Sequence, residues 1–263
     1  MAGVLHLSKT HLVIPDPHAH PDHNNQRFKW LGELIKDVKP DVVVNMGDHF
    51  DLASLSSYDK GKASFHSRSY ERDIESGLEA HELMWGPIKK TKKKMPYTVV
   101  LEGNHEHRIK KALEKDPELG GARFGISFKH FGFEDYYDEV VEYEGNTPGL
   151  VTIDGIVYSH YLASGLLGKP IGGEHHAYSI LSKYHKSATV AHSHTLDYSV
   201  RNDISGKKIM ACVAGVYQDY KTGWAGAVNN MWTSGVVLKT NVEDGVYDFR
   251  FISIDTLRKE YDI

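Results

Sequence analysis

Histidine, aspartate and asparagine side chains recur in this chain in short clusters that could hold metal ions. The cluster members are Asp16, His18, Asp48, Asn104, His160, His192 and His194. Neutral imidazoles are good ligands for Mn, Fe, Zn or Ni, whereas Mg prefers oxygen ligands and retained water. Two such ions about 3.5–4 Å apart can lower the pKa of water to about 7 and offset the charge that builds on a reacting phosphate. The residue types therefore indicate a two-metal site for hydrolysing phosphate esters.

Each cluster comes directly after a stretch that is typical of a β-strand. The predicted strands span 12–14, 41–46, 97–101, 156–159 and 188–191. Open α/β sheets place their sites at the carboxyl ends of strands, where loops are free to carry reactive side chains. We therefore expect the five strand ends to converge on one site.

Helical periodicity separates the first three of these strands. Apolar positions recur at helical spacing over 28–38, where Asn24 or Asn25 could cap the helix and Pro40 follows its end, and a second helical stretch spans 70–85. Alternation of strands with helices predicts parallel strand pairs in an α/β fold. From about residue 131 onward, short runs typical of strands dominate, and those not yet named span 139–143, 150–153, 209–213 and 235–240.

The composition is that of an ordinary globular protein, 40% hydrophobic and 25% charged over 263 residues. We expect one domain over residues 1–263, because no repeat or linker-like segment divides the chain. The sequence has neither a membrane-length apolar run nor a signal-like start, which predicts a cytoplasmic protein without a membrane segment. Cys212 is the only cysteine, so metal would have to bind histidines and carboxylates. The net charge of -4 gives no global attraction to nucleic acid.

The ordered series Asp-x-His, Gly-Asp-x-x-Asp, Gly-Asn-His-Glu, His and His-x-His resembles the calcineurin-like metallophosphoesterase superfamily over residues 16–194. The resemblance implies an α/β fold, a four-layer α/β/β/α sandwich of two mixed β-sheets flanked by helices, with the metals at the sheet edges. Compact members similar to this chain occur beside DNA-processing exonucleases and in bacteriophage genomes. The chain therefore resembles an exonuclease-like or phosphodiesterase-like, phage-encoded member.

The resemblance also implies a role for each motif residue. One metal would be held by Asp16, His18 and His194, the other by Asn104, His160 and His192, and Asp48 would bridge them. His105 would face the phosphate and act in catalysis with Asp48, as a general acid or as a charge. Asp51 and Glu106 would orient histidines, a role that metal sites commonly require.

Two positions beside these motifs leave alternatives open. Arg108, near the start of a predicted helix, could grip a substrate phosphate bidentately or form a surface ion pair with Glu106 or Glu114. Ala191 stands before His192, where the family usually has glycine. We expect ligation to survive this change unless the backbone at that position needs a positive φ.

Aromatic residues are frequent in the last third of the chain, and they include Tyr198, Tyr217, Tyr220, Trp224 and Trp232. Exposed rings could stack a nucleobase. Rings that cover the second sheet would instead belong to the core, and we expect core packing for this set.

The resemblance predicts hydrolysis of a phosphodiester in nucleic acid or nucleotides by a metal-bound hydroxide. The two divalent metal ions would be Mn, with Ni, Fe or Zn as alternatives. Ser/Thr protein phosphatases carry an arginine after the second aspartate of the second motif, whereas Leu52 follows Asp51 here. A phosphomonoesterase acting on phosphoproteins or small molecules is the alternative within this class. A non-catalytic metal-binding scaffold and a nucleic-acid-binding module with incidental metal are alternatives from other classes, and the oligomeric state is left open.

Overall fold

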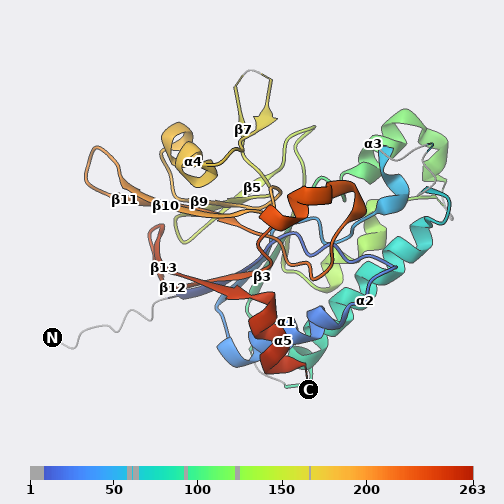
Figure 1. Cartoon of the computed structure of the whole chain (residues 1–263), viewed down its shortest axis with the longest axis horizontal. Coiled ribbons are helices and arrows are strands. Elements are labelled where there is room, and N and C mark those ends of the chain that lie inside the picture. Colours follow the sequence, from blue (N-terminus) through green and yellow to red (C-terminus); the bar gives the residue numbers. More distant parts are fainter. Residues whose placement is uncertain are drawn as a thin grey trace.

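The computed structural model describes residues 9–57, 61, 65–91, 94–121, 125–165 and 167–262. In this part of the chain two mixed β-sheets lie one above the other, and helices cover both outer faces (Figure 1). The first sheet has the strand order β13-β12-β1-β2-β3-β4, and the second has the order β10-β11-β9-β6-β5.

The first sheet is built around the three predicted N-terminal strands. Its strands span Lys9–Ile14 (β1), Val42–Asn45 (β2), Tyr97–Leu101 (β3), Glu139–Val141 (β4), Gly235–Glu243 (β12) and Val246–Ser253 (β13). Each neighbouring pair from β1 to β4 is parallel, as the alternation of strands and helices predicts. β12 joins β1 antiparallel and β13 joins β12 antiparallel, so the end of the chain completes the sheet.

The second sheet is mixed as well. Its strands span Leu150–Ile153 (β5), Ile156–Ser159 (β6), Ala188–Val190 (β9), Leu196–Asn202 (β10) and Lys208–Ala214 (β11). β9 lies parallel to both β6 and β11, whereas β5 and β10 are antiparallel edge strands. A two-stranded ribbon of Ala163–Ser164 (β7) and Lys169–Pro170 (β8) projects beyond this sheet (Figure 1).

Helices α1, α2 and α5 lie against the first sheet, and α4 lies against the second (Figure 1). The α-helices span Gln26–Val38 (α1), Tyr70–Lys89 (α2), Arg108–Lys115 (α3), His176–Tyr184 (α4) and Ile254–Tyr261 (α5). The 3₁₀ segments span Ala53–Leu55 (η1), Pro117–Gly120 (η4), Phe128–Phe131 (η5), Phe133–Asp135 (η6) and Gly223–Met231 (η7). Among the described residues, no helix is long and apolar enough to cross a membrane.

Alternating side chains of β1 show how the layers are held together. Leu12 and Ile14 pack into the core that α1 and α2 cover, whereas Val13 points to the opposite face and packs against the second sheet. This alternation follows from the two-residue period of a strand. A third core joins the second sheet to α4 through residues such as Ile180 and Val213. Three cores between four layers confirm the predicted α/β/β/α sandwich.

Two local predictions need correction. Asn25 occupies the N-cap of α1 but its side chain does not cap, and the Asn24 carboxamide oxygen instead accepts from Gln26 N at 2.5 Å. No helix is predicted from the sequence between 164 and 184, yet His176–Tyr184 forms α4, because Ala177, Ile180 and Leu181 provide an apolar stripe.

Candidate metal centre

The predicted ligands come from the carboxyl ends of strands in both sheets. Asp16 and His18 follow β1, Asp48 follows β2 and Asn104 follows β3, whereas His160 follows β6 and both His192 and His194 follow β9. Because the two sheets are stacked, these loops meet at one edge of the sandwich. The structure therefore brings all seven side chains into two neighbouring groups.

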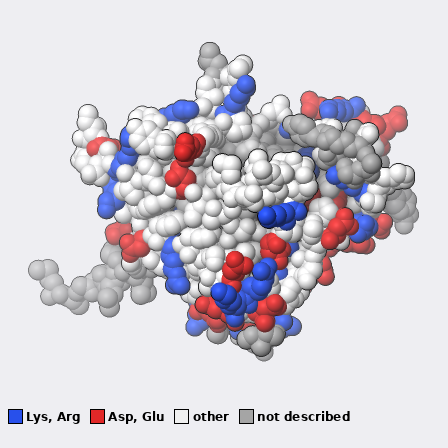
Figure 2. Space-filling view, in the orientation of Figure 1, with Lys and Arg blue, Asp and Glu red and all other residues white. Residues whose placement is uncertain are grey.

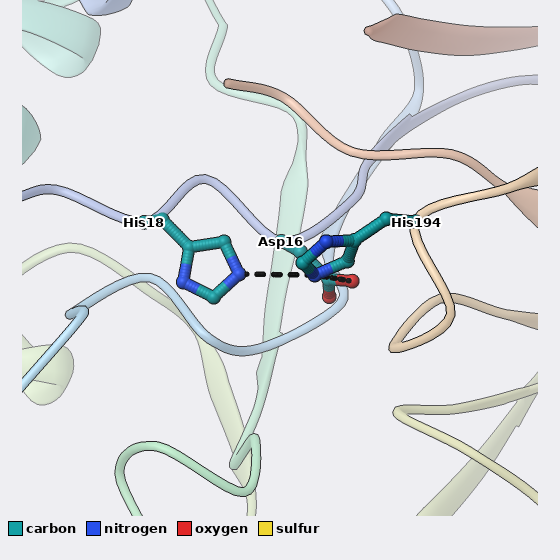
Figure 3. A group of neighbouring side chains, drawn as sticks. All are labelled: Asp16, His18 and His194. Atoms are coloured by element: carbon teal, nitrogen blue, oxygen red, sulfur yellow. Dashed lines mark hydrogen bonds and ion pairs between the residues drawn. The ribbon is translucent and has the colours of Figure 1, made fainter. Parts of the chain in front are cut away.

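The first group consists of Asp16, His18 and His194, whose ligand atoms lie within 4.8 Å of one another. The rings of His18 and His194 point toward each other, and their Nε2 atoms are 3.2 Å apart (Figure 3). His194 Nε2 is also 3.4 Å from Asp16 Oδ2. Asp16 Oδ1 is buried and has no hydrogen-bond partner among the described residues. A buried carboxylate beside two imidazole rings, with one oxygen left without a donor, is an arrangement that a cation would satisfy.

The second group consists of Asp48, His160 and His192, again with ligand atoms within 4.8 Å. His160 Nε2 lies 2.9 Å from Asn104 Oδ1 and 3.5 Å from Asp48 Oδ2. His160 Nδ1 lies 2.8 Å from the carbonyl oxygen of Met46, so this nitrogen carries the proton and donates it. Nε2 then presents its lone pair toward Asp48 and Asn104, as in a metal ligand.

A family model described as calcineurin-like phosphoesterase matches residues 9–221. The chain belongs to the calcineurin-like phosphoesterase family. This calcineurin-like phosphoesterase is therefore a hydrolase that acts on phosphoester bonds. The match stops before β12 and β13, although these strands complete the first sheet.

Two solved structures that are similar to this calcineurin-like phosphoesterase are distant from it in sequence. One, described as that of a "putative diadenosine tetraphosphatase", is 10% identical, with 94% of this chain and 96% of that chain covered and a TM-score of 0.39. Another crystal structure is 11% identical, with 94% of this chain and 100% of that chain covered and a TM-score of 0.40. No curated protein matches the sequence.

Asp51 and Glu106 stabilise the phosphoesterase site in different ways. Asp51 Oδ1 lies 3.2 Å from His18 Nδ1 and 3.5 Å from His105 Nδ1, a position from which it orients both rings. Glu106, which was expected to orient a histidine, accepts three backbone N–H groups instead, from Asp48 at 2.9 Å, Phe50 at 2.8 Å and Gly103 at 3.0 Å. Glu106 thus joins the loop after β2 to the loop after β3.

His105 and Arg108 lie together beside the two groups. His105 Nδ1 is 2.6 Å from the carbonyl oxygen of Asp51, and Arg108 Nη2 is 2.8 Å from His105 Nε2. Arg108 Nη1 donates to the carbonyl oxygens of Asp51 and Leu52 at 2.7 and 3.1 Å. Among the described residues, Arg108 forms no ion pair with a glutamate, which was the alternative left open by the sequence. Its guanidinium instead faces the site.

The carboxylates of the two groups respond differently to burial. Burial raises the pKa of Asp16 well above its usual value, and the negative charge of Asp48 adds to this effect. Burial also opposes ionisation of Asp48, but the neighbouring His105, His160 and His18 hold the pKa of Asp48 below its usual value. Two buried acids this close together need positive charge nearby, which bound cations would supply.

Burial favours the neutral form of the candidate histidine ligands. Burial lowers the pKa of His192 to about 3, and it also lowers the pKa values of His18, His160 and His194. A neutral imidazole is the form that binds a metal ion. His105 is different, because burial and Arg108 lower its pKa but Asp48 and Asp51 raise it, and the net direction is upward.

Five of the seven candidate ligands have a left-handed backbone conformation. Positive φ angles occur at Asp16 (38°), His18 (45°), Asp48 (51°), His192 (65°) and His194 (61°). Residues other than glycine rarely adopt this left-handed conformation, and strained positions of this kind gather at functional sites. Ala191 is not among the described residues with a positive φ, so its methyl group fits where the family usually has glycine.

Two aromatic neighbours of the site were not singled out as contacts of the ligands. Tyr161 has its ring centroid 4.9 Å from that of His192, and Trp232 contacts the ring of His194 edge-on with centroids 4.4 Å apart. Tyr161 directly follows His160 in the sequence, and this adjacency was the signal that could have predicted its position beside the site. Trp232 has no such signal, because 37 intervening residues and two strands separate it from His194.

Proposed function

We propose that this phosphoesterase hydrolyses phosphodiesters of nucleic acids or nucleotides with two divalent cations. The observation that carries the proposal is the convergence of seven candidate ligands at one edge of the sandwich, six of them in two His/Asp groups and Asn104 beside His160. Asp16, His18 and His194 would hold one cation, whereas Asn104, His160 and His192 would hold the other. Asp48 would bridge them.

The donor set supports manganese as the metal, with Ni, Fe or Zn as alternatives, because imidazole nitrogens outnumber carboxylate oxygens. When bound, the two cations lower the pKa of water and offset negative charge on the phosphoryl oxygens. Their positions are prepared by groups of this chain, since Met46 fixes the tautomer of His160 and Asp51 orients His18.

His105 is the side chain that we propose to act on the substrate directly. Its Nε2 lies 3.8 Å from Asp48 Oδ2, and its Nδ1 is held by the Asp51 carbonyl oxygen, so Nε2 faces the candidate metal groups. An approaching phosphate oxygen would take the place of Nε2 as the partner of Arg108 Nη2. His105 Nε2, released from Arg108, could then take up a proton from solvent and pass it to the leaving oxygen.

A phosphomonoesterase is the second candidate, and Arg108 is the observation that favours it. Leu52 stands where the protein phosphatases have their arginine, but Arg108 reaches the site from α3 and is aligned by two carbonyl oxygens. A guanidinium held in this way suits a terminal phosphate, which offers more free oxygens than a diester does.

The test is hydrolysis of bis-p-nitrophenyl phosphate by metal-stripped protein after Mn, Ni, Zn or Mg is added back. We expect Mn to restore turnover, Asp48→Asn to abolish it, and His105→Ala to lower kcat by about 10²–10⁴-fold. His130→Ala is the matched control, because His130 is exposed and its ring contacts only Tyr70 among the described residues.

Three results would contradict the proposal. Turnover that survives in His105→Ala would remove the role given to this side chain. Faster hydrolysis of p-nitrophenyl phosphate than of the diester, without cleavage of nucleic acid, would establish the phosphomonoesterase instead. Bound metal without turnover of either ester would favour the non-catalytic scaffold.

A further inference from the structure

The segment that follows β11 carries large apolar side chains on its surface beside the metal centre. Trp224 is 74% exposed, Met231 is 68% exposed and Val228 is 51% exposed. All three belong to η7, the orange-red segment near the centre of Figure 1, and Figure 2 shows few charged side chains over that part of the face. The expectation of core packing is therefore wrong for Trp224. Apolar side chains that gather on one exposed segment are typical of a binding surface, whereas single exposed apolar residues are not.

Both ends of this segment are attached to candidate metal ligands. Before η7, the Tyr220 hydroxyl donates to the carbonyl oxygen of His18 at 2.7 Å. After η7, Thr233 N donates to the carbonyl oxygen of His194 at 3.0 Å. The segment therefore spans from His18 to His194, two of the three members of the first group, and lies beside the candidate metal centre.

Hydrogen bonds within the segment fix its shape. The Asn229 side chain accepts from Thr222 N at 3.0 Å and donates to the carbonyl oxygens of Thr222 at 2.8 Å and Gly226 at 2.9 Å. Gly226 has a φ of 50° and a ψ of -125°, a combination that only glycine adopts readily. The exposed ring of Trp224 is thus held on a closed loop, which reduces the entropy that binding would cost.

Two indole rings form the part of this surface nearest to the metals. Trp224 and Trp232 have ring centroids 5.8 Å apart, and Trp232 lies against His194. A ligand that places its phosphate at the candidate metal centre could lay a flat group on the Trp224 ring. No core side chain would have to move, because this ring is exposed. Lys221, just before η7, donates to Asn230 Oδ1 at 3.1 Å and adds a positive charge to the same segment.

We propose that Trp224 and Trp232 form a stacking subsite for a nucleobase of the substrate. The inference rests on the proposed function and narrows it, since it assigns the substrate class to nucleotides or single-stranded nucleic acid rather than to small or protein phosphoesters. Bases stack on exposed aromatic side chains with little sequence preference, because every base has a π-face. Trp224 is then a specificity-determining residue, and the reacting phosphate is held elsewhere.

The test compares two diesters that have the same leaving group. Thymidine 5′-monophosphate p-nitrophenyl ester carries a base, whereas methyl p-nitrophenyl phosphate does not. We expect Trp224→Ala to raise KM for the thymidine ester about tenfold, the fold-change that corresponds to about 1.4 kcal/mol. The methyl ester should be unaffected, and Trp224→Phe should retain most of the preference. Ile204→Ala is the matched control, because Ile204 is a fully exposed apolar residue in the turn beyond β10.

A binding measurement separates failure of this inference from failure of the proposed function. AMP and ribose 5-phosphate differ only in the base, and their affinities for the Mn-loaded protein can be measured by calorimetry without turnover. Tighter binding of AMP that is lost in Trp224→Ala would support the subsite even if neither diester were hydrolysed. Equal effects of the variant on both ligands and both esters would overturn the inference, as would a change of oligomeric state in Trp224→Ala with the base preference intact.

Discussion

Replacement of Glu106 by glutamine tests whether this carboxylate sets the position of Asp48. In the structure Oε2 accepts from Asp48 N at 2.9 Å and Gly103 N at 3.0 Å, while Oε1 accepts from Phe50 N at 2.8 Å. Burial and the charge of Asp48 raise the pKa of Glu106 to about 8. Both oxygens nevertheless face N–H donors, so no described group accepts a carboxyl proton, and we assign the charged form.

The cost of Glu106→Gln follows from this geometry. Glutamine keeps one acceptor oxygen and places an NH₂ group against at least one of the three donors. Loss of a hydrogen bond to a charged group costs about 1.5–3 kcal/mol. We therefore expect a loss of about 2–3 kcal/mol in the free energy of unfolding, or roughly 5–10 °C in Tm. We also expect Mn affinity to fall about 10–100-fold, as for other groups that orient metal ligands.

Glu102→Gln provides the matched control for this experiment. Glu102 is also fully buried and accepts from Lys110 Nζ at 2.7 Å and Tyr143 N at 2.6 Å, but Asp48 is not among its contacts. Urea denaturation should show that both variants lose stability, and Mn titration calorimetry should show weaker binding only for Glu106→Gln. Equal Mn affinity of the Glu106 variant and the wild type would refute the reasoning.

Three further predictions concern the metals, the close packing around Asp48 and a buried amine. Mn at about 100 times its Kd should raise Tm by roughly 5–10 °C in differential scanning fluorimetry, because binding to the folded state alone contributes about 2.7 kcal/mol. Asp48→Asn should lose this shift in Tm. In Gly103→Ala the new Cβ would lie 2.2 Å from Asp48 N and Oδ1. We therefore expect the variant to lose hydrolysis, while its circular dichroism spectrum still shows a folded protein. Wild-type activity of this variant would contradict the predicted clash. Burial lowers the pKa of Lys239 from 10.5 to about 7. Between pH 7 and 10.5 the unfolded chain therefore binds more protons than the folded chain. The free energy of unfolding should rise with pH in this range, by at most about 1.4 kcal/mol per pH unit. Lys239→Met should remove that rise in denaturation curves recorded from pH 7 to 10, and an unchanged slope would show that the buried amine does not titrate there.

The strands that carry the site could be predicted from sequence because they are buried on both faces. β2 and β3 read as continuous apolar runs, and each ends at the polar cluster that the structure places at the metal centre. β10 and β13 were not predicted. Both are edge strands, and polar residues on their exposed sides interrupt the apolar pattern.

The contacts of the site were less predictable than its residues. Glu106 was recognised from its motif, but its partners Asp48 and Phe50 lie more than 50 residues away, and only the parallel pairing of β2 with β3 brings the two loops together. The stacking surface could not be predicted from the sequence either. The exposure of Trp224 depends on the closed conformation of η7 and not on its sequence neighbours.

The division of the candidate ligands between the sheets links metal binding to the core between them. His194 from the second sheet completes the group of Asp16 and His18, and His160 from the second sheet faces Asp48 from the first. Neither group exists until residues between the sheets, such as Val13, Val44 and Cys212, have packed. The left-handed backbone at five candidate ligands costs about 1–2 kcal/mol per residue, so these loops need that packing to keep their shape. By linkage, cations that bind across the two sheets must stabilise the same core, and a cavity made there should weaken metal binding at a distance from the metals.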